Sequence, residues 1–183
     1  MKSVNGHQVG RTLFDAPRIA ERVDGLAAEI SRDYAGADVT IIAILKGSYI
    51  FLADLTRALD IPVKVDFLGV SSYVGAESSG GFEWHAHLTT SIEGRDVLLV
   101  EDIADTGRTL RYVIDHLNGH SPLSVRVCAL LDKPSRRLVD VPVDYVGFEI
   151  PDEFVVGYGL DYEGWYRQLP YIGVMEPVGD RPA

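Results

Sequence analysis

Acidic and hydroxyl side chains gather in one segment of nine residues in the middle of the chain, Glu101-Asp102-Ile103-Ala104-Asp105-Thr106-Gly107-Arg108-Thr109. The segment follows an aliphatic run, Val97–Val100, and precedes apolar residues at helical spacing. The free backbone N–H groups of a helix start, together with a glycine and two hydroxyls, suit an anion such as phosphate. Carboxylates directly upstream can accept hydrogen bonds from sugar hydroxyls. The segment therefore predicts a sugar-phosphate site.

Other nucleotide-binding patterns do not occur in the chain. It holds neither a GxxxxGK[ST] loop nor a GxGxxG turn. Two simpler interpretations of the acidic segment stay open at this point. Glu101 and Asp102 can form a solvated turn, and Asp105 can cap the helix that follows, a position for which aspartate is well suited.

The elements that must position this segment alternate between strands and helices. Apolar spacing predicts helices around Ile19–Ile30, Phe51–Leu59 and Leu110–Leu117, and residues 71–90 read as a long loop or a loose hairpin. Aliphatic runs predict strands at Val39–Leu45, Val63–Val70, Val97–Val100, Val125–Leu131 and Val143–Ile150. This alternation is typical of an α/β fold with a mostly parallel sheet, in which ligands bind at the carboxyl ends of the strands.

Composition narrows the class of protein. A chain of 183 residues, 46% hydrophobic and 24% charged, is long enough to fold around one core. The net charge of −10 argues against nucleic acid as a partner, because phosphate backbones require clustered lysine and arginine. A lone cysteine, Cys128, excludes an intrachain disulfide framework and is expected in the core. Neither a secretory signal nor a membrane span is evident, so we expect a cytoplasmic protein with no membrane partner.

Several motifs are similar to those of a known family. VLLVEDIADTGRTL (97–110) resembles the phosphoribosyl pyrophosphate signature of type I phosphoribosyltransferases. Five further segments are similar to bacterial hypoxanthine-guanine phosphoribosyltransferases: LKGSYIFLADL (45–55), VDFLGVSSY (65–73), LLDKPSRR (130–137), VDYVGFEIPDEFVVGYGLDY (143–162) and LPYIGV (169–174). The resemblance implies a type I phosphoribosyltransferase fold with helices flanking the sheet. It implies one domain over 1–183, with a core at about 36–150 and a small hood lobe from about 1–20 and 151–183.

The resemblance also implies an activity. The family transfers a 5-phosphoribosyl group from phosphoribosyl pyrophosphate to N9 of hypoxanthine or guanine, which yields IMP or GMP and pyrophosphate in purine salvage. Two alternatives stay open: a relative that prefers xanthine, and a non-catalytic regulator of the same fold that senses nucleotides and binds RNA. The charge of −10 disfavours the regulator. Family members are homodimers or homotetramers.

By this resemblance, the acidic segment divides into three tasks. Glu101 and Asp102 would bind the ribose hydroxyls. Asp105 would be the catalytic residue, a general acid or base at purine N7. The 5′-phosphate loop would consist of Asp105, Thr106, Gly107, Arg108 and Thr109.

Three residues further along match the purine-binding positions. Lys133 would donate to the purine 6-oxo group, because an ammonium is a donor only and selects a 6-oxo over a 6-amino base. Phe154 would stack on the base, and Val155 would meet the base edge through its backbone carbonyl. Without the resemblance, Lys133 would be expected to be an exposed lysine and Phe154 a core residue.

The remaining matches concern pyrophosphate and magnesium. Lys46 and Gly47 match the pyrophosphate loop, in which the peptide bond between Leu45 and Lys46 can be cis. Arg167 matches an arginine that contacts pyrophosphate. Asp161 matches a carboxylate tied to Mg²⁺, directly or through water, and Glu101 and Asp102 complete the predicted metal residues.

Ser72 and Tyr73 match a mobile loop that closes over the reacting centre. Two places depart from the family pattern: Ala104 replaces a larger aliphatic residue, and residues 80–88 lack the basic side chains common in relatives. These departures bear on loop closure more than on the chemistry.

Overall fold

The central strand of the molecule is β2 (Val39–Leu45), and its apolar sequence explains its place. Ile41 and Ala43 pack into the core on one face of the sheet, whereas Ile42 and Ile44 pack into the core on the other. A strand with apolar residues on both faces must be covered on both. The computed structural model, which describes residues 3–72 and 81–178, places β2 in the middle of a six-stranded sheet.

The order of this sheet is β4-β3-β2-β5-β6-β7. All neighbouring strands are parallel except β3 and β4, which are antiparallel, so the predicted mostly parallel sheet is confirmed. The other strands are β3 (Val63–Ser72), β4 (Phe82–Ala86), β5 (Asp96–Ala104), β6 (Ser124–Asp132) and β7 (Tyr145–Glu149).

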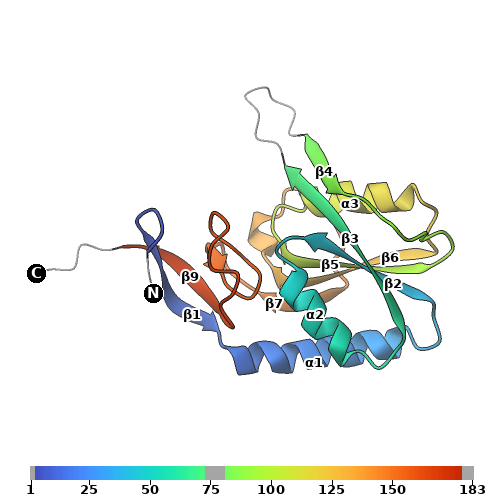
Figure 1. Cartoon of the computed structure of the whole chain (residues 1–183), viewed down its shortest axis with the longest axis horizontal. Helices are drawn as coiled ribbons and strands as arrows, with labels where there is room; N and C mark the ends of the chain where they lie inside the picture. Colours follow the sequence, from blue (N-terminus) through green and yellow to red (C-terminus); the bar gives the residue numbers. More distant parts are fainter. Residues whose placement is uncertain (1–2, 73–80, 179–183) are drawn as a thin grey trace, which may run out of the picture.

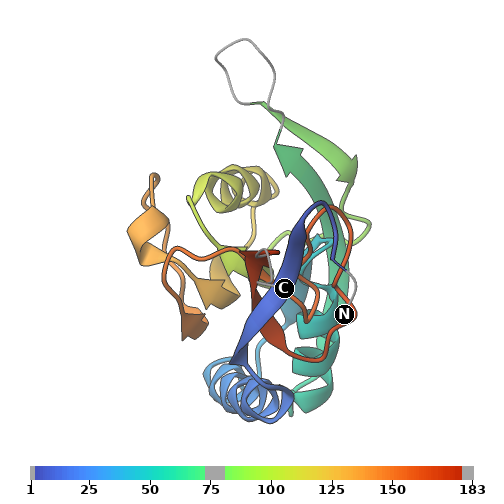
Figure 2. The same cartoon turned by 90° about the vertical axis from the view of Figure 1, so that its left-hand side faces the viewer.

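Helices cover both faces of the sheet (Figures 1 and 2). Helices α1 (Ala16–Asp33) and α2 (Tyr49–Ala58) pack on one face, and α3 (Arg108–Asn118) packs on the other. A single turn of 3₁₀ helix, η1 (Pro134–Arg136), follows β6. The buried residues of each helix belong to the apolar face that its sequence spacing predicted. Cys128 on β6 is fully buried, as expected.

Two strands extend beyond the aliphatic runs that predicted them. β5 continues past Val100 to Ala104, so Glu101 and Asp102 lie inside the strand rather than after its end. Ladder pairing with β6 stabilises this extension, because it reaches Ala104 opposite Asp132. β3 continues to Ser72 and pairs antiparallel with β4, in agreement with the hairpin alternative for this region.

A second, three-stranded antiparallel sheet lies beside the core. It consists of β1 (His7–Phe14), β9 (Ile172–Pro177) and β8 (Val155–Val156), in the order β1-β9-β8. Its strands come from the two ends of the chain and lie together at the left of Figure 1. Phe14 stacks on Phe148 of the core at a ring distance of 4.0 Å. We propose that this sheet and the 157–171 connection form the expected hood.

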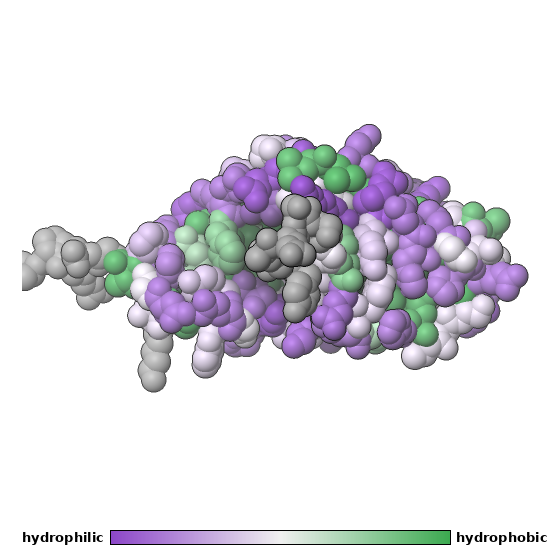
Figure 3. Space-filling view, turned by 90° about the horizontal axis from the view of Figure 1, so that it is seen from above, coloured by the Kyte–Doolittle hydropathy of each residue, from purple (hydrophilic) through white to green (hydrophobic). Residues whose placement is uncertain are grey.

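The surface is polar over most of the face that carries the β3–β4 hairpin. Figure 3 shows this face as largely hydrophilic, with separate hydrophobic patches. Within the described ranges, the structure contains no helix of sufficient length and hydrophobicity to span a membrane.

Candidate active site

The predicted residues converge at the carboxyl edge of the sheet. β2 and β5 are neighbours there, and the chain continues from β2 to β3 on one side and from β5 to β6 on the other. The connections from β2 and β5 thus leave in opposite directions along the sheet, and such a switch point leaves room for a ligand between the two strands. Lys46 and Gly47 follow β2, Glu101 and Asp102 lie in the last part of β5, and Lys133 follows β6.

The turn between β5 and α3 has the form expected of an anion cradle. Gly107 caps the helix with a left-handed φ of 83° and no side-chain capping hydrogen bond, so the capping role considered for Asp105 is wrong. A Cβ at Gly107 would approach the Val139 carbonyl oxygen closer than 3.0 Å, so only glycine fits this turn. A cavity of about 180 Å³ opens at this turn and is lined by residues that include Glu101, Asp105, Thr106, Gly107 and Thr109. Arg108 is exposed.

The carboxylate of Glu101 is buried without a partner. The residue is 8% exposed, and its Oε2 accepts no hydrogen bond from any residue that the structure describes. Burial raises the pKa of this carboxyl well above its usual value, and the neighbouring charge of Asp102 raises it further. An unpartnered buried carboxylate is costly to the fold, and such groups call for a functional explanation. Hydroxyl donors of a bound sugar would satisfy it.

Asp102 lies in β5, and its carboxylate lies against Gly47 in the loop that follows β2. Its Oδ1 accepts a hydrogen bond from the Ile103 backbone N–H at 2.9 Å. Burial raises the pKa of Asp102 to about 6, although the backbone hydrogen bonds and the charge of Arg167 lower it. A Cβ at Gly47 would overlap the Asp102 carboxylate, so the absence of a side chain at Gly47 makes room for it.

An arginine that the sequence did not predict holds Asp105. The Arg136 Nε donates to Asp105 Oδ1 at 3.2 Å, and its Nη1 donates to Asp152 Oδ2 at 3.4 Å. Arg137 Nη1 donates to the Asp105 carbonyl oxygen at 3.1 Å. These contacts fix the orientation of Asp105. Both arginines lie in the LLDKPSRR motif, but nothing in their spacing identified a partner 31 residues upstream.

The three purine-binding candidates differ in their exposure. Lys133 is 6% exposed, with its Nζ 4.0 Å from Asp152 Oδ1, so the alternative of an exposed lysine is wrong. Phe154 is 55% exposed and meets the Tyr162 ring edge-on at a centroid distance of 5.7 Å, so it is not a core residue. An exposed aromatic face is free to stack on a base. Val155 is buried in β8.

The pyrophosphate candidates come from the core and from the 157–171 connection. The Leu45–Lys46 peptide bond is cis, as the resemblance implies. Arg167 forms an ion pair with Asp161, Nη2 to Oδ1, at 2.6 Å. The Arg167 charge also lowers the pKa of Asp102, and the Asp161 charge raises it, so the three groups share one electrostatic environment.

The carboxylates alone do not form a complete metal site. Across 3–72 and 81–178, no group of three or more His, Cys, Asp or Glu side chains is arranged to hold a metal ion. Asp161 is also engaged by Arg167 and by the Gly164 N–H. Mg²⁺ prefers one or two carboxylates plus phosphate oxygens and water, so the unpartnered Glu101 and its neighbour Asp102 fit a metal that arrives with its substrate.

The two mobile-loop candidates lie where the first described range of the chain, 3–72, ends. Ser72 is the last residue of β3 and pairs with Phe82 of β4. Tyr73 lies outside the described residues.

The chain is similar to known phosphoribosyltransferases in both sequence and structure. A model of the phosphoribosyl transferase domain matches residues 10–163. The hypoxanthine-guanine phosphoribosyltransferase of Bacillus subtilis is 44% identical over 173 residues, which covers 94% of this chain and 96% of that protein. A crystal structure of a Staphylococcus aureus hypoxanthine phosphoribosyltransferase superposes with a TM-score of 0.88 at 44% identity, covering 92% of each chain. A Bacillus anthracis hypoxanthine-guanine phosphoribosyltransferase gives 0.87 at 42% identity, covering 93% of this chain and 99% of that one.

Proposed function

The chain belongs to the phosphoribosyltransferase family, in its hypoxanthine-guanine branch, and from this premise we propose how its residues carry out the reaction. It is a purine-salvage enzyme that joins the 5-phosphoribosyl group of phosphoribosyl pyrophosphate to N9 of hypoxanthine or guanine. The observation that best supports our assignment of roles is the buried Glu101 carboxylate, which lines a cavity of about 180 Å³ at a helix start.

The sugar and its phosphate occupy the β5–α3 turn in this proposal. Backbone N–H groups of 105–109 and the Thr106 and Thr109 hydroxyls bind the 5′-phosphate. Glu101 and Asp102 accept hydrogen bonds from the ribose hydroxyls. Positive charge develops on the sugar as the bond from C1′ to pyrophosphate breaks, and the two carboxylates stabilise it electrostatically.

The base lies between Lys133 and Phe154. The Lys133 ammonium donates to the 6-oxo group, Phe154 stacks on the ring, and the Val155 carbonyl accepts from the base edge. Asp105 moves the proton at N7. Arg136 positions Asp105 for this step through the hydrogen bond at 3.2 Å.

Pyrophosphate leaves toward Lys46, Gly47 and Arg167. Arg167 is released from Asp161 to contact the leaving group. Mg²⁺, held by pyrophosphate oxygens with Glu101, Asp102 and Asp161, would neutralise charge on the leaving group when bound. We also propose that the enzyme acts in the cytoplasm as a homodimer or homotetramer, which light scattering distinguishes.

Base competition tests the assigned specificity. Purified protein with phosphoribosyl pyrophosphate and Mg²⁺ receives hypoxanthine, guanine and xanthine together, and chromatography identifies the nucleotides formed. We expect IMP and GMP to exceed the xanthine nucleotide, because the similar proteins are named hypoxanthine-guanine phosphoribosyltransferases. Predominance of the xanthine nucleotide would reverse the specificity assignment and favour the alternative.

Asp105→Asn is expected to slow turnover about 100-fold, which is the scale of general acid–base catalysis, while the KM of both substrates changes little. The amide retains the shape of the carboxylate but cannot exchange the N7 proton. Single-turnover rates measure the step directly. Asp115→Asn on α3, at an exposed aspartate, is the matched control. An Asp105→Asn variant with a wild-type single-turnover rate would contradict the assigned role.

Chelation of Mg²⁺ is expected to lower turnover about 100-fold or more without unfolding the protein. The described residues contain no complete metal cage, so the fold does not depend on the ion. Turnover and Tm are measured in excess EDTA and again after Mg²⁺ is restored. A Tm that falls by more than about 5 °C in EDTA would indicate a structural metal instead.

A further inference from the structure

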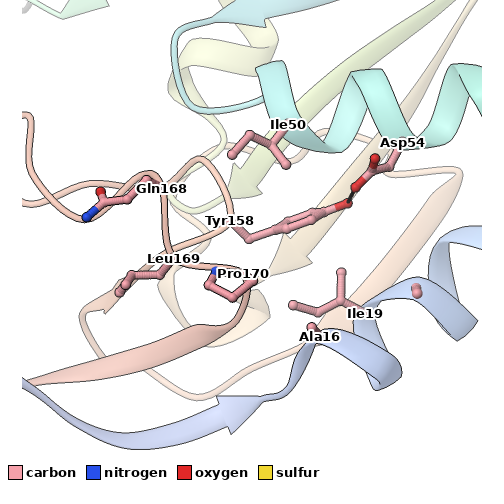
Figure 4. Close-up of a pocket in the computed structure, with 9 residues that line it drawn as sticks. Ala16, Ile19, Ile50, Asp54, Tyr158, Gln168, Leu169 and Pro170 are labelled. Carbon is pink, nitrogen blue, oxygen red and sulfur yellow. Dashed lines mark hydrogen bonds between the residues drawn. The ribbon is translucent and has the colours of Figure 1, made fainter.

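A partly buried hydrogen bond joins the 157–171 connection to helix α2. The Tyr158 hydroxyl donates to Asp54 Oδ2 at 2.7 Å, across 104 residues of sequence. Tyr158 is only 6% exposed. Figure 4 shows its ring extending from the connection toward Asp54 on α2. A hydrogen bond to a charged acceptor is stronger than one between neutral groups.

The backbone around Tyr158 has an unusual conformation. Tyr158 has a φ of 52°, between Gly157 at 100° and Gly159 at 104°. Glycine tolerates this left-handed region, but a tyrosine is rare there and its backbone is strained. Such a conformation persists only where surrounding contacts hold it.

Core packing and the backbone supply part of this restraint, since Tyr158 belongs to the main apolar core and its N–H donates to the Leu169 carbonyl oxygen at 2.8 Å. A cavity of about 410 Å³ lies between α1, α2 and the connection, with Ile19, Ile50, Leu169 and Tyr158 among its lining residues (Figure 4). The ring has no close-packed neighbour on the side of this cavity. The hydroxyl adds a directional contact there, which fixes the ring relative to α2.

The restrained turn leads directly to the pyrophosphate candidates. The Gly159 N–H donates to the Arg167 carbonyl oxygen at 3.0 Å, and Arg167 Nη1 donates to the Gly159 carbonyl oxygen at 2.6 Å. Gly159 lies so close to the Gly47 carbonyl oxygen that a Cβ would approach it within 3.0 Å. Helix α2, which holds Asp54, begins two residues after Gly47. Tyr158 and Asp54 thus connect the two segments that would contact pyrophosphate.

We propose that Tyr158 and Asp54 are positioning residues for the pyrophosphate half of the substrate. Their hydrogen bond holds Arg167 at a fixed distance from the Lys46–Gly47 loop. Neither residue touches the substrate. The inference rests on the proposed function, since it takes Arg167 and the loop as the pyrophosphate contacts.

Tyr158→Phe tests the inference, because it removes the hydroxyl and keeps the ring. We expect the KM for phosphoribosyl pyrophosphate, and the Kd of pyrophosphate with Mg²⁺ by calorimetry, to rise about tenfold. The KM for hypoxanthine should stay within about twofold. Tyr145→Phe is the matched control: Tyr145 is also buried and donates to an aspartate, Asp33 Oδ2 at 3.0 Å, but it joins β7 to α1.

Rescue at the acceptor separates positioning from general destabilisation. Asp54→Asn retains an acceptor oxygen and should remain within about twofold of wild type, whereas Asp54→Ala should reproduce the Tyr158→Phe effect. The double variant Tyr158→Phe/Asp54→Ala should have the same KM for phosphoribosyl pyrophosphate as each single variant. Because Asp54 also pairs with the exposed Arg57, Arg57→Ala serves as a control with unchanged KM values.

Three results would overturn the inference. The first is a Tyr158→Phe enzyme with wild-type affinity for both pyrophosphate ligands. The second is an equal rise for both substrates, and the third is the same selective rise in Tyr145→Phe. Each leaves the proposed function intact, because the wild-type enzyme turns over. A wild-type protein that turns over no 6-oxopurine would overturn the proposed function and this inference together.

Discussion

Replacement of Gly47 by alanine is expected to lower kcat/KM for phosphoribosyl pyrophosphate by about 100-fold, which is the scale of a misplacement near 1 Å in an active site. The new methyl group would occupy the space of the Asp102 carboxylate. Asp102 cannot move freely, because its Oδ1 is tied to the Ile103 N–H. Either the carboxylate or the loop must shift, and both are assigned to the substrate. Steady-state kinetics with varied phosphoribosyl pyrophosphate measures the loss.

Gly25→Ala on α1 is the control for this prediction. Gly25 is exposed, and a methyl group there would meet only Arg22 at an ordinary 3.5 Å. Alanine in a helix is favoured over glycine by about 1 kcal/mol, so this variant should be slightly more stable and fully active. A Gly47→Ala enzyme with wild-type kinetics would show that Asp102 need not occupy its present position.

Glu101→Gln is expected to stabilise the ligand-free protein and to impair the enzyme. Glutamine keeps the shape of the side chain but removes a buried, unpartnered carboxylate. Burial of an unpartnered charge costs more than burial of a neutral amide, so the Tm of the variant should be higher at a pH where Glu101 is ionised, by about 3 °C for each kcal/mol gained. The lost charge weakens the ribose contact, so kcat/KM should fall about 10- to 100-fold. Stability and function oppose one another at this residue.

The pH dependence of the same variant gives a sharper result. Because burial raises the pKa values of Glu101 and Asp102, the folded protein binds more protons than the unfolded chain above about pH 4. The free energy of unfolding contributed by these groups therefore falls as pH rises from about 4, and the part due to Asp102 levels off above about pH 6. The stability gain of Glu101→Gln should be larger at pH 8 than at pH 5, as measured by thermal unfolding without Mg²⁺.

Exposed Glu93 supplies the control, since Glu93→Gln should change neither Tm nor activity. A Glu101→Gln protein less stable than wild type at pH 8 would mean that the Glu101 carboxylate is paired in the folded protein. In that case the Glu101 carboxylate would not be free to accept hydrogen bonds from the ribose hydroxyls.

The core strands of the fold could be predicted from local runs of aliphatic residues. The strand at Val39–Leu45 was predicted with its final boundaries, because an unbroken aliphatic run ends there at both sides. The extension of β5 to Ala104 was missed, because Glu101 and Asp102 interrupt the apolar pattern where function requires polar groups. β8 was also missed, because two residues of strand have no period to detect and depend on pairing with β9.

Site residues with local motifs were predicted, and those with distant partners were not. The segment around Asp105 predicted a phosphate site at the start of α3, because all of its candidate residues lie in one short stretch of sequence. Arg136 and Tyr158 lie in the quoted motifs, but their contacts were not predicted, because their partners lie 31 and 104 residues away in sequence. Only the folded chain brings such pairs together, and neither residue type indicates its partner.

Conversion of hypoxanthine tests the central claim most directly. Purified protein is incubated with phosphoribosyl pyrophosphate, Mg²⁺ and hypoxanthine, and the products are quantified by chromatography. We predict IMP and pyrophosphate in equal amounts, and GMP when guanine replaces hypoxanthine. Failure to form a nucleotide from hypoxanthine, guanine or xanthine would contradict the assignment of this chain as a purine phosphoribosyltransferase.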